Sequence, residues 1–131
     1  MDLEALSMDE LFFFDQKREA LPLYLALRDR MEKAGIPGTF QAKKTQISFI
    51  NRHLFGAASF LPVLKAKDRP GPFLTVTFGL DHRLDSPRIH GAVEAYPGRW
   101  THHIVIGKEE ELDRELMDWL MEASLFAAGK R

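Results

Sequence analysis

The apolar residues of this chain change their spacing twice, and the changes separate three segments. Residues 18–34 and 108–129 carry apolar side chains every three or four positions, which is the period of an amphipathic helix. Residues 39–106 instead contain runs in which apolar and polar side chains alternate, as they do along strands. The pattern therefore predicts helices near both ends of the chain and a sheet between them.

Two helices are expected ahead of the strands. Ser7 precedes Glu10 by three residues, which is the spacing of a capping box, so a short helix should begin there. A second helix covers residues 18–34 and is followed by Gly35, a suitable C-terminal cap. Pro22 falls inside this span, so it lies either in the first turn of the helix or at a kink.

Four strands are predicted, over residues 39–50, 54–62, 73–80 and 99–106. In the first of them, alternation places Ile47 and Phe49 on one face. Lys44, Gln46 and Ser48 then point to the other face.

Residues 81–98 show no steady period and are expected to form a long loop, with a helical turn over residues 87–92. The other links are short, and each long helix has one apolar stripe. We therefore expect an α+β fold, in which a largely antiparallel sheet of about four strands has N-terminal helices and a C-terminal amphipathic helix packed on one face. With 131 residues, the chain is expected to be a single domain.

Composition narrows the function classes. The chain has no cysteine, which excludes a disulfide framework, a thiolate nucleophile and cysteine-based metal sites. The first ten residues are acidic and do not resemble a signal peptide. The longest uncharged run, residues 53–64, is too short to span a bilayer as a helix. We therefore expect a cytoplasmic protein that does not associate with membranes.

The charge is unevenly distributed, although the net charge is only −1. Residues 1–37 hold 8 acidic and 5 basic residues, and residues 108–131 hold 7 acidic and 4 basic ones. Residues 38–107 hold 4 acidic and 9 basic residues together with all five histidines. Part of this asymmetry follows from the composition of helices and strands. The other interpretation is that the basic middle of the chain meets an anion.

The adjacent histidines of the last strand must point to opposite faces of the sheet, since side chains alternate along a strand. His102 shares its face with Trp100 and Ile104, so we expect it in or beside the core, holding a hydrogen bond. His103 shares its face with Arg99 and Thr101 and is the better candidate for a site. Both histidines are candidates for a catalytic role, but no nucleophile is evident beside them.

A polar platform results if the strand faces coincide. It would bring together Lys44, Gln46, Ser48, Thr75, Thr77, Arg99, Thr101 and His103. These side chains offer donors and positive charge without a carboxylate, which suits a phosphate, a nucleotide or a nucleic-acid backbone. Arg83 and Arg88 of the long loop could close over them. Solvent-facing polar residues on a half-buried sheet are the simpler interpretation.

Two alternatives remain. The first is a histidine-dependent enzyme that uses His102 or His103 with Asp85 or Glu94. A divalent metal could assist it, and Asp81, His82, Asp85, His90 and Glu94 offer nitrogen and oxygen ligands. No zinc-protease, phosphate-loop or dinucleotide motif occurs, so no metal and no cofactor is predicted. The second is a ligand-free interaction domain, a homodimer with Met8 and Phe12 to Phe14 at its interface.

Five stretches carry a family resemblance. They are KKTQISF (43–49), FGL (78–80), SPRI (86–89), PGRWTHH (97–103) and ELDRELMDWLMEA (111–123). Together they resemble the bacterial family called domain of unknown function 5655, over about Leu11 to Ala128. The resemblance supports the α+β fold. It implies no catalytic residue, although some members of that family are joined to nuclease-like domains, which implies a nucleic-acid context for those proteins.

Overall fold

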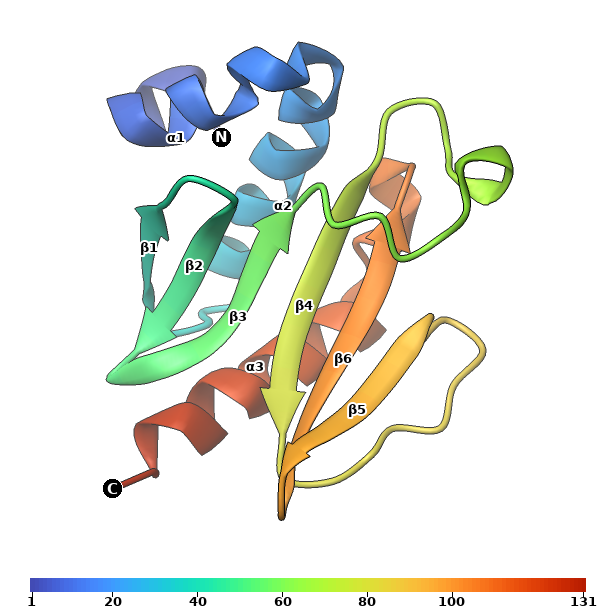
Figure 1. The fold of residues 1–131 in the computed structure, drawn as a ribbon. Coiled ribbons are helices and arrows are strands. Elements are labelled where there is room, and N and C mark those ends of the chain that lie inside the picture. Colours follow the sequence, from blue (N-terminus) through green and yellow to red (C-terminus); the bar gives the residue numbers. More distant parts are fainter.

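The fold is a six-stranded antiparallel sheet with helices packed against one of its faces (Figure 1). A computed structural model describes all residues, 1–131. The strands are β1 (Thr39–Ala42), β2 (Gln46–Asn51), β3 (His53–Ser59), β4 (Leu74–Leu80), β5 (Gly91–Tyr96) and β6 (Arg99–Ile106). Their order in the sheet is β1-β2-β3-β4-β6-β5, and every neighbouring pair is antiparallel. The predicted α+β class is confirmed, and the predicted number of strands is wrong.

Three α-helices accompany the sheet: α1 (Met8–Phe13), α2 (Leu21–Lys33) and α3 (Arg114–Ala128). Short 3₁₀ turns cover Leu3–Ala5, Phe14–Gln16, Arg18–Ala20, Ala66–Asp68 and Glu109–Glu111. In Figure 1, α2 and α3 lie behind the sheet, and the opposite face is turned toward the viewer. We call this second face the open face. None of the helices has the length and apolar content needed to cross a membrane.

The core lies between the sheet and the helices. Alternate residues of β4, among them Val76 and Phe78, are fully buried and form part of this core. Leu27 of α2 and Leu120 of α3 are equally buried and belong to the same cluster. Burying one such side chain contributes about 1.5–3 kcal/mol, so this layer dominates the stability of the domain.

The helix starts follow the predicted signals. The hydroxyl of Ser7 accepts from the backbone N–H of Glu10 at 3.1 Å, and the Glu10 carboxylate accepts from the Ser7 N–H at 2.9 Å. Pro22 lies in the first turn of α2 and does not kink it. The last helix begins at Arg114, with Asp113 as its cap, because the glutamates at 109–111 form a separate 3₁₀ turn.

A buried polar cluster joins α1, α2 and β1. The Glu10 carboxylate accepts hydrogen bonds from the Tyr24 hydroxyl and from the Arg28 guanidinium. Arg28 in turn lies over the ring of Phe40, with its central carbon 3.6 Å from the ring centroid. Burial, and then the hydrogen bond to Glu10, raise the pKa of the Tyr24 hydroxyl. These contacts account for the buried carboxylate, which would be costly without partners.

Two expectations about the middle of the chain are wrong. Residues 39–50 do not form one strand but a hairpin, in which β1 and β2 are joined by a turn at residues 43–45. The expected loop over residues 81–98 contains β5 and lacks the predicted helical turn. Gly98, with a positive φ of 72°, follows Pro97 in the two-residue turn that returns the chain into β6.

Candidate functional site

The strand register places the predicted polar strand residues on one face of the sheet, the open face, but Thr75 is fully buried there, and its hydroxyl donates to the Leu61 carbonyl at 2.8 Å. Ser48 of β2 lies opposite Ala57 of β3, Ala57 opposite Thr77 of β4, and Thr77 opposite His103 of β6. The four residues thus form one row across the sheet. Ser48 is fully buried, and its hydroxyl accepts a hydrogen bond of 2.9 Å from the Gln46 amide.

One hollow of about 390 Å³ lies on this face beside the β1–β2 turn. We call it the Lys44 hollow. It is lined by Gln16, Lys44, Thr45, Gln46, Ser59, Phe60, Leu61, Thr77 and His103. Lys44 enters it from the turn that the sequence pattern missed, so this side chain reaches the platform from a loop and not from a strand.

A second hollow, of about 400 Å³, lies where β3 and β4 separate. These two strands pair only from Gly56–Ser59 to Thr75–Phe78, and beyond Phe78 the strand β4 pairs with β6 alone. We call this hollow the Arg99 cleft. It is lined by Gln46, Leu54, Phe55, Gly56, Ala57, Thr77, Phe78, Gly79, Leu80, Ala95, Tyr96, Arg99, Trp100, Thr101 and Lys130. Gln46 and Thr77 line both hollows, so the two adjoin.

Two cations of the Arg99 cleft share one aromatic ring. The Arg99 guanidinium carbon and the Lys130 ammonium each lie 4.9 Å from the centroid of the Phe126 ring. Burial, and then the charge of Arg99, lower the pKa of Lys130. The charge of Arg99 also helps to lower the pKa of Asp81, after the larger effect of the hydrogen bond between Asp81 and His82. Arg99 and Lys130 are therefore neighbouring positive charges held by the same ring.

His103 is the one histidine that lines the Lys44 hollow. Its Nδ1 lies 2.8 Å from the Thr77 hydroxyl, and burial lowers the pKa of its imidazole. The imidazole is thus mostly neutral at pH 7, and an anion beside it would favour its protonated form.

His102 occupies the other face, as the alternation predicts. It is fully buried, its ring stacks on Phe78 with centroids 5.2 Å apart, and its Nε2 accepts from the Leu84 backbone N–H at 3.0 Å. Burial lowers the pKa of this imidazole. Because Nε2 is an acceptor, the ring is neutral with its proton on Nδ1. His102 therefore ties the loop after β4 to the core.

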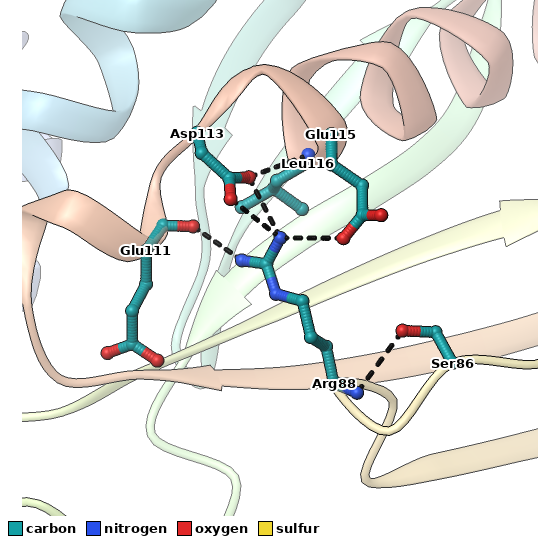
Figure 2. Close-up of polar contacts among 6 residues, drawn as sticks. All are labelled: Ser86, Arg88, Glu111, Asp113, Glu115 and Leu116. Carbon is teal, nitrogen blue, oxygen red and sulfur yellow. Dashed lines mark hydrogen bonds and ion pairs between the residues drawn. The ribbon is translucent and has the colours of Figure 1, made fainter.

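Arg88 does not close over the platform, and that expectation is wrong. Figure 2 shows its guanidinium at the start of α3, where it donates to Asp113 at 2.8 and 3.0 Å and to Glu115 at 3.0 Å. It also donates to the backbone oxygen of Glu111 at 2.6 Å. Leu84 and Ile89 of the same loop pack against the core. Residues 84–89 of this loop therefore lie on the helix side of the sheet and do not cover the open face.

The groups named for the enzyme alternative are dispersed. The Glu94 carboxylate accepts from the Gly98 N–H at 3.2 Å, and neither Glu94 nor Asp85 is hydrogen-bonded to a histidine. Asp81, His82 and Glu122 do approach one another, within 4.8 Å, but all three are exposed. His82 presents Nδ1 to Asp81 at 2.7 Å and Nε2 to Glu122 at 3.6 Å. Its two nitrogens thus face different carboxylates and link the loop after β4 to α3.

The aromatics named for the dimer alternative are divided between core and surface. Phe13 and Phe14 are buried, and both pack against Phe60. Phe12 and Met8 remain exposed on α1. The structure thus assigns two of the three phenylalanines to the core of the domain itself.

Sequence reasoning missed Lys130, Gln16 and Tyr96. Lys130 follows the C-terminal cap and lies four residues after Phe126, which is a spacing that places two helical side chains together. That spacing was a usable signal. Gln16 and Tyr96 reach the open face through tertiary packing that no local pattern encodes.

Together, these features define a small antiparallel α+β domain whose sheet carries helices on one face and a polar, partly hollowed surface on the other. The chain belongs to the family described as Domain of unknown function (DUF5655), whose model matches residues 10–127. No curated protein and no solved structure matches it.

Proposed function

We propose that this domain is a binding module whose open face holds a small anionic ligand with a phosphate or carboxylate group. One observation carries the proposal: two adjoining hollows contain three cations and no carboxylate among their lining residues. Lys44, Arg99 and Lys130 take part in none of the ion pairs of the chain. A bound anion would supply the partner that these cations lack.

The surrounding groups have complementary roles in this proposal. Arg99 offers a planar fork of donors to an oxyanion, and Lys44 offers a compact charge. Gln46 and Thr77 provide uncharged hydrogen-bonding groups between the two hollows, and Thr101 provides one in the Arg99 cleft. His103 adds positive charge only when it is protonated.

A small ligand fits these surroundings better than a nucleic-acid backbone does. Asp9 and Asp15 line the neighbouring hollow on the far side of Lys44. A long polyanion that crossed Lys44 would meet these carboxylates, and the chain as a whole carries a net charge of −1. A compact anion held within the two hollows would not reach these carboxylates.

Thermal unfolding in inorganic phosphate at low ionic strength tests the proposal. A ligand at a hundredfold its dissociation constant adds about 2.7 kcal/mol to the free energy of unfolding. We expect phosphate to raise the melting temperature, and we expect sodium chloride to weaken the effect by screening. Arg99→Ala and Lys44→Ala should each reduce the phosphate response.

Arg114→Ala is the matched control, since Arg114 is an exposed and unpaired cation on α3. It should respond to phosphate as the unmodified protein does. An equal loss of response in all three variants would show only a general charge effect. No response of the unmodified protein to phosphate would overturn the proposal.

A further inference from the structure

We infer that the Arg99 cleft binds an anion with an apolar or aromatic body, such as an aryl phosphate or an aryl carboxylate, in preference to a bare inorganic anion. The inference rests on the proposed function and specifies its ligand class. It follows from the division of the cleft into a cationic end and an apolar remainder.

The cationic end has a defined geometry. The Arg99 and Lys130 side chains both lie on the Phe126 ring, which limits their motion. Arg99 also donates to the backbone oxygen of Gly98 at 3.2 Å, so part of its guanidinium is anchored. The remaining donors of the fork match the oxygens of a phosphate or a carboxylate.

The rest of the cleft is mostly apolar and is open to solvent. Leu54 and Tyr96 line it with exposed fractions of 54% and 72%, and Phe55, Phe78 and Trp100 are its other aromatic residues. A hydrated inorganic anion gains nothing from such surface, whereas a ligand with a ring would remove it from water. The volume of about 400 Å³ lies within the range of small-molecule sites.

Gly79 leaves the floor of the cleft free of side chains. It alternates with Thr77 along β4, so a side chain at position 79 would stand on the open face. A Cβ atom built there would meet only the backbone oxygen of Trp100, at 3.8 Å, which is ordinary contact. Gly79→Val should therefore fill the cleft without disturbing the strand, since β-branched residues suit strand positions.

Calorimetric titration with inorganic phosphate, phenyl phosphate and phenol tests this inference. We expect phenyl phosphate to bind about tenfold more tightly than inorganic phosphate, because the ring buries apolar surface. Phenol, which lacks the anionic group, should bind more weakly than phenyl phosphate. Gly79→Val should abolish the preference for phenyl phosphate while phosphate still binds, and Arg99→Ala should weaken both anions.

Tyr96→Ala provides a second variant, because this exposed side chain can be removed without opening the core. It should reduce the preference for phenyl phosphate and leave the binding of inorganic phosphate unchanged. Equal affinities of the two anions for the unmodified protein would overturn the inference and leave the proposed function standing. A preference that survived both Gly79→Val and Tyr96→Ala would also overturn it. If neither anion bound, the proposed function would fail together with the inference.

Discussion

The hydroxyl of Thr77 on β4 lies 2.8 Å from Nδ1 of His103 on β6, at directly opposite positions of the antiparallel ladder. This contact fixes the orientation of the imidazole at the edge of the Lys44 hollow. It leaves Nε2 as the ring nitrogen without a hydrogen bond inside the chain. A ligand in the hollow would therefore contact His103 at Nε2.

The first prediction concerns the protonation of His103. Its pKa is lowered by burial, and an anion in the Lys44 hollow would stabilise the imidazolium. We expect phosphate to raise the pKa of His103, and Lys44→Ala to diminish that rise. A nuclear magnetic resonance titration of the ring protons, with sodium chloride at matched ionic strength, measures both effects. A pKa of His103 that is the same in both salts would contradict the prediction.

The second prediction concerns stability in mild acid. Burial lowers the pKa of both His102 and His103, so below about pH 6.5 the unfolded chain takes up protons that the folded chain does not. Stability should therefore fall as the pH drops from 7.5 to 5.5. Urea denaturation at several pH values measures this slope. His103→Gln should make the slope shallower, and an unchanged slope would show that His103 contributes nothing to it.

Much of the open face could be predicted from alternation alone. In β4 and β6 one set of alternate residues is mainly apolar and the other is mainly polar, so Thr77 and His103 were expected to share a face once both segments were strands. The same argument placed Gln46 and Ser48 correctly, although their strand begins later than expected. A strand with one buried face shows a regular alternation of apolar and polar residues. The residues of its opposite face can therefore be predicted from the sequence.

The predictions from sequence are wrong where a strand has no buried face, or where two interacting residues lie far apart along the chain. β5 is the outer strand of the sheet and is largely exposed on both faces, so its residues need no alternation. The hairpin turn at residues 43–45 gives no clear signal, because Lys43, Lys44 and Thr45 include none of the residues, such as glycine, proline or asparagine, that usually mark a turn. The carboxylates that pair with Arg88 lie about 25 residues away along the chain, at the start of α3, and no local spacing signals such a pair.

The third prediction compares two glycines of neighbouring strands. A Cβ atom at Gly56 would lie 2.5 Å from the backbone oxygen of Thr77 and 3.1 Å from Cδ2 of Phe49. Gly56→Ala should therefore push β3 from β4 and cost about 1–3 kcal/mol of stability. Gly79→Ala has room at its site and should be neutral or stabilising by up to about 1 kcal/mol. Urea denaturation distinguishes the two variants, and equal losses would contradict the argument.

The last prediction separates stability from binding at Arg88. Burial raises the pKa of Asp113, but the hydrogen bonds from Arg88 and from the Leu116 N–H outweigh this effect and lower that pKa overall. Arg88→Ala would leave Asp113, which caps α3, and Glu115 without their shared cation, and it should cost about 1 kcal/mol, because both carboxylates are about half exposed and water replaces part of the lost contact. Arg88→Lys should recover only part of this loss, because an ammonium group cannot reproduce the fork that reaches Asp113, Glu115 and the Glu111 carbonyl together.

Phosphate binding completes the test of Arg88. Because its guanidinium lies on the helix side of the sheet, Arg88→Ala should bind phosphate as tightly as the unmodified protein at a temperature where both are folded. Arg99→Ala should show the reverse behaviour, with weaker phosphate binding and a smaller loss of stability, since its exposed side chain forms no ion pair. Weaker phosphate binding by folded Arg88→Ala would mean that the loop after β4 reaches the open face when the ligand is present.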